Sequence, residues 1–465
     1  MSKIHKNINN IKDLFKAKQN AKEITMKSSV NSQQSFLESY FRLEENKTTV
    51  KTEILAGITT FMTMSYILVV NPSILSQTGM NFGSVFTATA LAAIISTLLM
   101  GLYAKLPFAQ APGMGLNAFF AYTMVIGMGH TWQFALTTAF LEGIIFILLT
   151  AFNVREAIIG SIPNNIKKAI SVGIGLFIAF IGLENAQIVL HPKSGTILTL
   201  GDVTSSVPLL AIIGIIITGV LLARNVKGAL LIGIIITTLI GIPMGITKIP
   251  SAILSVPPSI SPIFMKFEWN HIFTKDMFIA LFTLLFMDMF DTVGALVGVS
   301  TKAGMIDENG NVPRAKQALL SDAIGTTLGA CFGTSTVCTF LESASGVAAG
   351  GKTGLTAVST AVMFIIALFL SPLFLMIPSA ATAPSLILVG LFMMSPIKEI
   401  DFLDFTEAIP AFLTIIMMPL AYSISDGLIF GIISYVLLKV FTNKAKEVSI
   451  STYIIAALFV LKFFI

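Results

Sequence analysis

Two stretches, 106-LPFAQAPGMGLNAFFAY-122 and 332-FGTSTVCTFLESASGVAAGG-351, interrupt long apolar regions with residues that disfavour a continuous helix. Pro112 and Gly113 in the first stretch weaken helical backbone, and the run from Ser335 to Phe340 in the second favours extended backbone. Each stretch therefore predicts a short extended piece followed by a half-helix. Within a membrane, such backbone is tolerated only where it is buried in protein or lines a polar cavity.

The whole chain has the composition of a membrane protein. Its 465 residues are 55% hydrophobic and 11% charged, and the mean hydropathy is +0.87. A soluble globular protein carries about 25% charged residues. The net charge of +5 therefore does not indicate nucleic-acid binding. The two cysteines offer neither a disulfide framework nor the spacing of a metal site, so no metal and no cofactor is predicted.

Apolar runs long enough for a helix to cross a bilayer, about 20 residues, recur after a Lys- and Asn-rich tail at 1–52. The tail has no apolar run of its own, so it is expected to stay in the cytoplasm. With the two interrupted stretches included, we expect fourteen crossings in an all-α polytopic membrane protein. The uninterrupted spans are expected near 53–72, 84–104, 132–153, 166–184, 207–223, 227–247, 276–300, 316–332, 353–374, 379–395, 408–423 and 426–441.

The distribution of basic residues supports this count, because cytoplasmic loops collect Lys and Arg. Connections after odd-numbered spans hold only Lys193, Lys248, Lys266 and Lys275. The bias requires that both interrupted stretches count as crossings, and it places the N-terminus in the cytoplasm. Connections after even-numbered spans, and the residues after the last span, hold Lys105, Arg155, Lys167, Lys168, Arg224, Lys227, Lys302, Arg314, Lys316, Lys352, Lys398, Lys439, Lys444 and Lys446.

The two halves of the chain also resemble each other. For example, 161-SIPNNIKKAISVGIGLF-177 is similar to 376-MIPSAATAPSLILVGLF-392. A unit of seven spans is odd, so a second copy must be inserted upside down, as in secondary transporters. We therefore expect repeats at 53–248 and 276–441, with a C-terminal segment at 442–465.

Four polar residues near the interrupted crossings are candidates for substrate binding. Asn117 and Glu342 fall where the two half-helices are expected to begin, near Leu116 and Leu341. They could also serve only as a helix cap and a first-turn carboxylate. Asp288 and Asp291 lie three residues apart, on one face of the eighth span. A charged carboxylate is costly at this depth in a membrane. Asp288 and Glu342 are expected to contact substrate, and Asp291 to tune or receive a proton.

Other polar residues compete for these roles. Glu142 and Asp322 lie inside the fourth and ninth spans but away from the interruptions in the sequence, which favours hydrogen bonding between helices. Ion coupling is the alternative for both. The four histidines fall in the tail or in loops, and none has the setting of a ligand or proton relay.

With these residues in view, the chain from about Phe36 onward resembles the nucleobase–cation symporter-2 family and its AzgA-like adenine, guanine and hypoxanthine permeases. The motifs that carry the resemblance include "APGMGLNAFFAYT", "FMDMFDTVGALVGV" and "GTSTVCTFLESASGVAAGG". Two residues depart from the family pattern, Cys338 in place of Thr and Phe340 in place of Tyr. The resemblance implies a UraA-like fold of fourteen segments in two inverted seven-segment repeats, with core and gate domains. The core holds segments one to four and eight to eleven.

The resemblance also implies that Asn117, Asp288, Asp291 and Glu342 hold or support a purine nucleobase. A neutral base brings no charge of its own, so accumulation requires a coupling ion, and the protonatable carboxyl groups favour H⁺. We therefore expect an H⁺-coupled permease of the plasma membrane, not an enzyme, and a homodimer is left open. Uracil, xanthine or an inorganic anion would be the cargo of an alternative permease. An intramembrane hydrolase or a channel is less favoured.

Overall fold

The computed structural model describes residues 36–152, 163–192, 198–306 and 312–464. Over these residues the chain is mainly helical, and eight helical runs are long and apolar enough to cross a membrane. Four shorter apolar helices accompany them in the same described residues. The protein is therefore a helical membrane protein, as its composition predicts. Most of the N-terminal tail, Arg155 and Lys193 lie outside the described residues.

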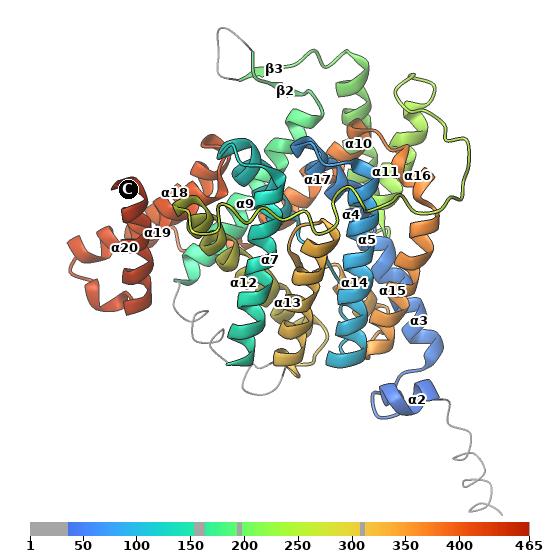
Figure 1. The fold of residues 1–465 in the computed structure, drawn as a ribbon, viewed down its shortest axis with the longest axis horizontal. Helices are drawn as coiled ribbons and strands as arrows, with labels where there is room; N and C mark the ends of the chain where they lie inside the picture. The colour runs from blue at the N-terminus through green and yellow to red at the C-terminus, as the bar shows by residue number, and fades with distance from the viewer. Residues whose placement is uncertain (1–35, 153–162, 193–197, 307–311, 465) are drawn as a thin grey trace, which may run out of the picture.

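Helices, with a few short strands, make up the chain in the following order (Figure 1). They are α2 (Phe36–Phe41), α3 (Val50–Met64), α4 (Ile67–Leu75), η1 (Ser76–Thr78), α5 (Phe82–Leu99), η2 (Met100–Ala104), β1 (Gln110–Pro112), α6 (Met114–Ala118), η3 (Phe119–Gly127), α7 (Trp132–Ala151), α9 (Asn164–Asn185), β2 (Val189–Leu190), β3 (Thr199–Leu200), α10 (Ser206–Ala223), α11 (Ala229–Gly241), α12 (Lys275–Lys302), α13 (Ala315–Phe332), β4 (Val337–Thr339), α14 (Ser343–Ala348), α15 (Gly354–Phe369), α16 (Ser371–Leu375), α17 (Ser379–Met393), η4 (Ser395–Glu399), α18 (Phe405–Leu420), α19 (Ile424–Phe441), η5 (Ala445–Glu447) and α20 (Ile450–Phe464).

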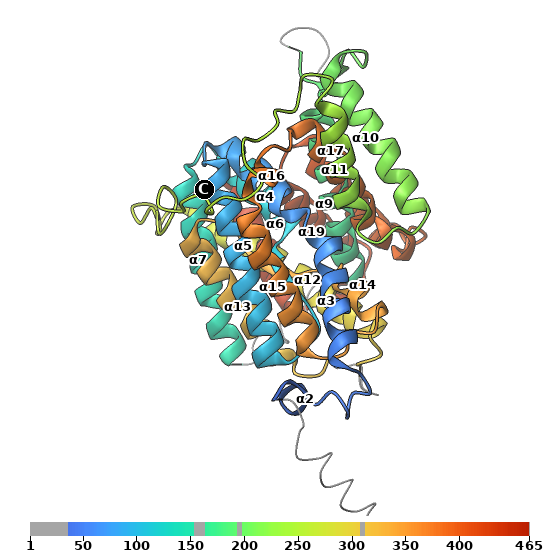
Figure 2. The same cartoon turned by 90° about the vertical axis from the view of Figure 1, so that its right-hand side faces the viewer.

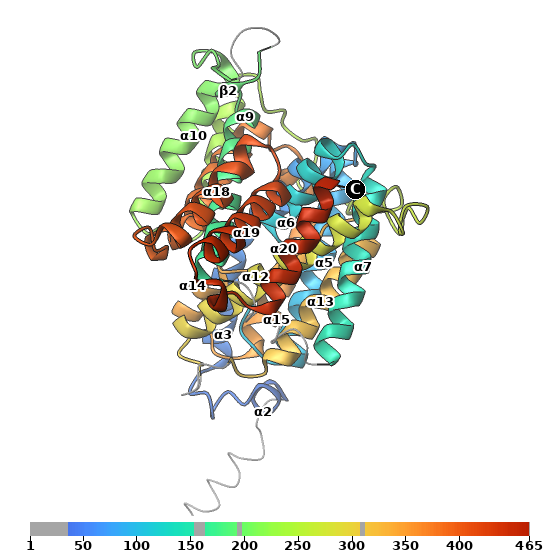
Figure 3. The same ribbon diagram turned by 90° about the vertical axis from the view of Figure 1, so that its left-hand side faces the viewer.

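The helices pack in two groups that combine distant parts of the chain. In the first group α7 packs on α12 and α13, α13 on α5, α5 on α15, and α3 on α14 and α15. In the second group α9 packs on α17 and α18, α18 on α19, and α10 on α11 and α17. Figure 3 shows α10 and α18 on the opposite side of the molecule from α7 and α13, and Figure 2 shows the same for α10.

The two extended pieces predicted from the interrupted stretches are confirmed as β1 and β4. They pair antiparallel with Ala111 opposite Cys338. The pairing is close, because a Cβ on Gly113 would lie 2.7 Å from Cys338 Sγ. The predicted half-helix starts are confirmed to within two residues: α6 begins at Met114, near Leu116, and α14 begins at Ser343, near Leu341.

The first crossing contains an interruption that the sequence does not predict. The backbone leaves the α-helical pattern at Ser65 and Tyr66, between α3 and α4. The N–H groups of Leu68 and Val69 donate to carbonyls three residues back, at 3.1 and 3.0 Å. These tighter bonds are typical of 3₁₀ geometry, which often marks a functional site within a helix.

A carboxylate of α3 caps the start of α15. Glu53 is fully buried, and it accepts hydrogen bonds from the backbone N–H groups of Lys352 and Thr353 at 3.0 and 3.2 Å. The hydroxyl groups of Thr353 and Thr356 also donate to it, at 2.9 and 2.6 Å. A helix start leaves N–H groups without partners, so this distant acid fastens α15 to α3.

Candidate functional site

A cavity of 730 Å³ lies between the two groups of helices, and we call it the central cavity. One wall comes from the α3–α4 junction, α12 and the segment from β4 to α14. The other comes from the α10–α11 connection and the end of α17. Several lining residues near that connection are exposed, so the cavity reaches the surface there. The residues used below are Tyr66, Asn225, Lys227, Asp291, Cys338, Phe340 and Glu342.

Glu342 lies at the N-cap of α14, and its side chain caps no backbone N–H of that helix. The carboxylate instead accepts a hydrogen bond from the hydroxyl of Tyr66, with 2.5 Å between Oη and Oε1. Both residues line the central cavity. Tyr66 was not predicted as a site residue, since nothing in an apolar run marks one tyrosine as the partner of an acid 276 residues away.

Asp291 also lines the central cavity, beside the paired strands. The close approach at Gly113 shows how near they are, because a Cβ there would lie 3.3 Å from Asp291 Oδ2 and 2.7 Å from Cys338 Sγ. Only a residue without a side chain lets the β1–α6 turn come this close to α12. Asp291 and Glu342 are thus the two predicted acids that the structure brings to the cavity.

Asp288 and Asn117 lie behind the cavity wall. Asp288 is fully buried, and the Thr292 hydroxyl lies 3.1 Å from its Oδ1 and 3.1 Å from Asp322 Oδ2. Asn117 is also fully buried, and its Oδ1 accepts a hydrogen bond from the Ser335 hydroxyl. Neither residue lines the central cavity.

Glu142 and Asp322 join the helices to the extended pieces. Thr336 donates to Glu142 Oε2 at 2.6 Å, and Gln110 Nε2 donates to Asp322 Oδ1 at 3.3 Å. Asp322 Oδ2 also accepts a hydrogen bond from Thr292 of α12 at 3.1 Å, so the predicted bonding between helices is confirmed for Asp322. The Thr336 partner of Glu142 lies next to β4 and not on a helix. The prediction that both acids lie away from the interruptions was wrong, because their partners Gln110 and Thr336 belong to the interrupted stretches. Gln110 was missed because a lone amide in sequence carries no sign of its partner.

Comparison with known proteins identifies the family. Residues 51–430 match the model of the Permease family denoted Xan_ur_permease. The chain belongs to the nucleobase–cation symporter-2 family of permeases. This permease is 43% identical to the adenine permease AdeP of Escherichia coli, over 92% of this chain and 96% of the relative. It is also 43% identical to the guanine/hypoxanthine permease PbuG of Bacillus subtilis, over 92% and 99%.

Solved structures share the fold of this permease at low identity. The transmembrane domain of a cyanobacterium bicarbonate transporter, BicA, aligns with a TM-score of 0.62 and 16% identity, covering 82% of this chain and 97% of that one. At this identity the likeness shows the fold alone. The family assignment makes the protein a transporter and not an enzyme.

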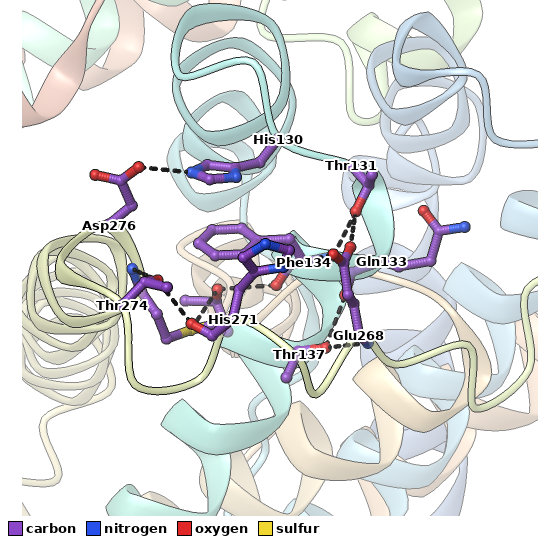
Figure 4. Close-up of polar contacts among 11 residues, drawn as sticks. His130, Thr131, Gln133, Phe134, Thr137, Glu268, His271, Thr274 and Asp276 are labelled. Atoms are coloured by element: carbon purple, nitrogen blue, oxygen red, sulfur yellow. Dashed lines mark hydrogen bonds and ion pairs between the residues drawn. The ribbon is translucent and has the colours of Figure 1, made fainter.

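A second polar cluster in this permease involves two of the histidines (Figure 4). His130 Nε2 lies 3.0 Å from Asp276 Oδ2, and His271 Nδ1 lies 2.7 Å from Glu268 Oε1. Thr131 also donates to Glu268. The hydrogen bond from the Thr131 hydroxyl lowers the pKa of the Glu268 carboxyl, and the hydrogen bond with His271 lowers it by a smaller amount. The cluster links the loop before α12 to the start of α7, and none of these residues lines the central cavity.

Proposed function

We propose that this permease takes up the purine nucleobases hypoxanthine, guanine and adenine by H⁺ symport. The single observation that carries the proposal is the pair of carboxyl groups, Asp291 and Glu342, on one wall of the central cavity. A purine base presents ring N–H groups, and a carboxylate accepts hydrogen bonds from such donors. The names of the relatives AdeP and PbuG support this class of substrate.

The remaining lining of the cavity suits a flat and neutral ligand. Its volume of 730 Å³ falls within the range of about 300–1,000 Å³ for small-molecule sites. Phe340 supplies an aromatic face beside the acids, whereas Phe119 and Phe120 are buried and do not line the cavity. Lys227 lies on the exposed α10–α11 connection, so it contributes a positive charge at the rim.

Asp288 and Asp291 exchange the roles expected from the sequence. Asp291 lines the cavity and is proposed to contact the base together with Glu342. Asp288 lies behind the wall, where Thr292 joins it to Asp322. We propose that Asp288 acts with this buried network in holding the coupling proton. Asn117 supports the wall, and its Nδ2 has no hydrogen-bond partner among the described residues.

The same proposal includes the finer architecture. Fourteen crossings in two inverted repeats, 53–248 and 276–441, are supported by the antiparallel pairing of β1 and β4 from the third and tenth crossings. Alternating access would then move the group containing α3 and α14 against the group containing α10 and α17. A cytoplasmic N-terminus and a plasma-membrane location complete the proposal, supported by the charge bias of the loops.

Uptake of labelled hypoxanthine into cells that lack purine transport tests the proposal. We expect Glu342→Gln and Asp291→Asn each to reduce uptake at least about tenfold, since each removes a charged acceptor. A protonophore should abolish accumulation while leaving counterflow of the base intact. The control is Glu45→Gln, on an exposed ion pair with Arg42. Normal uptake by both site variants at normal membrane levels would contradict the proposal.

A second candidate cargo is uracil or xanthine on the same fold. Competition of hypoxanthine uptake by adenine, guanine, xanthine and uracil separates the cases. Strong inhibition by adenine and guanine, and weak inhibition by uracil and xanthine, is the expected result. The reverse order would assign the alternative cargo.

A further inference from the structure

We propose that Tyr66 is a positioning residue, which holds the Glu342 carboxylate so that one oxygen is turned toward the base. The proposal rests on the proposed function of the central cavity and adds a residue to it. Tyr66 lies at the unpredicted interruption between α3 and α4, and the residue is only 1% exposed. Its hydroxyl reaches Glu342 Oε1 at 2.5 Å.

Residues of the first crossing pack closely against α14, and this packing sets where Glu342 lies relative to Tyr66. The Thr63 hydroxyl lies 3.4 Å from the backbone oxygen of Glu342. One turn further along α14, a Cβ on Gly346 would lie 2.0 Å from Thr60 Oγ1 and 2.8 Å from the Ala56 oxygen. This close contact requires glycine and leaves α14 no room to shift toward α3.

The hydrogen-bond capacity of the two groups then decides which atoms meet the substrate. The phenol hydroxyl has one hydrogen to donate, and the carboxylate has two oxygens that can accept one. Because the Tyr66 hydroxyl donates to Oε1, that oxygen is engaged and Oε2 is the better acceptor for a donor in the cavity. The buried Tyr66 ring cannot follow a rotation of the carboxylate. Glu342 therefore presents a single oriented acceptor that matches one ring N–H of the base.

Binding of labelled hypoxanthine to the purified, reconstituted permease tests the proposal. We expect Tyr66→Phe to raise Kd and KM about tenfold, the range of one hydrogen bond to a charged group, with the maximal rate changed less than about twofold. The matched control is Tyr435→Phe, since Tyr435 is also a buried tyrosine but does not line the cavity. It should change neither parameter.

Analogues of hypoxanthine methylated at one ring nitrogen distinguish positioning from general packing. The analogue that lacks the N–H read by Glu342 should bind the wild type weakly and Tyr66→Phe no more than about twofold more weakly. An equal loss for hypoxanthine and every analogue would overturn the proposal, and so would unchanged hypoxanthine binding by Tyr66→Phe.

A spectroscopic measurement avoids any loss of folding in the variant. With 3-fluorotyrosine at position 66, the ¹⁹F resonance should move on Glu342→Gln and on addition of hypoxanthine. If neither change alters the ¹⁹F chemical shift, the positioning role is overturned. Failure of the wild type to bind any purine would instead overturn the proposed function, so the two failures are distinct.

Discussion

Three carboxyl groups in or near the wall of the central cavity accept a hydrogen bond from another part of the chain. Tyr66 donates to Glu342, Thr336 to Glu142, and Gln110 to Asp322. Burying an acid without such a donor is costly, so the donors are part of the reason that these positions tolerate acids. The acids themselves are visible in the sequence, because charge is rare in apolar spans. Their donors are ordinary polar residues, and only the fold identifies them.

Glu268 gives a pH-dependent prediction outside the membrane spans. Its pKa is lowered in the folded protein, chiefly by the Thr131 hydroxyl and then by His271. A carboxyl group whose pKa is lowered on folding stabilises the folded protein at pH values above its ordinary pKa of 4.5. This stabilisation is lost as the pH falls through the lowered pKa. Glu268→Gln should therefore have a lower Tm than the wild type at pH 7, and the difference should vanish at acid pH.

The measurement is thermal unfolding of purified protein in detergent between pH 7 and pH 3. Glu45→Gln is the control, since its exposed partner Arg42 lies 3.6 Å away in a surface pair. Surface pairs of this kind contribute little. A Tm difference for Glu268→Gln that stays constant over the whole pH range would contradict the prediction.

At the scale of elements, proline and glycine are the residues that make interruptions predictable. They mark β1 and its turn to α6, and a cluster of β-branched residues marks β4. The interruption at Tyr66 carries no such mark, because residues 65 and 66 suit a helix as well as a bend. The bend coincides with the hydrogen bond from Tyr66 to Glu342, a residue 276 positions further along the chain.

The cap that α3 supplies to α15 is testable as a contribution to stability. Glu53→Ala leaves four donors on Lys352, Thr353 and Thr356 without their acceptor, and we expect a loss of about 1–3 kcal/mol, as for buried groups left unpaired. Thermal unfolding in detergent measures it. Glu45→Ala, an exposed acid close in sequence, should leave Tm unchanged. An unchanged Tm for Glu53→Ala would show that water replaces the cap.

At the scale of the whole molecule, the cavity exists only because two groups of helices meet. Its lining combines α3, α12 and α14 from one group with α17 and the α10–α11 connection from the other. It reaches the surface near Asn225, on the α10–α11 connection, which the proposed orientation places on the cytoplasmic side. In Figure 2, α10 and α11 extend further than α5 and α13 toward the end opposite α2.

Accessibility from the two sides of the membrane tests this arrangement. Asn225→Cys should react with an impermeant maleimide in inside-out vesicles and not in intact cells, and hypoxanthine should slow the reaction. The control is Thr199→Cys, on exposed β3 at the end of the molecule away from α2, which should react in intact cells (Figure 1). Labelling is measured above the level of the wild type, which retains Cys331 and Cys338. The opposite pattern would reverse the orientation.

The sequence by itself determined the membrane class, the two extended pieces and the set of acids near them. Composition and the backbone preferences of proline, glycine and β-branched residues are local properties, so they can be identified without the fold. Only the tertiary structure decided that Asp291 lines the cavity while Asp288 lies behind it, and that Tyr66 bonds Glu342. Two acids three residues apart share a helix face, but what packs against each is supplied by distant segments brought together by folding.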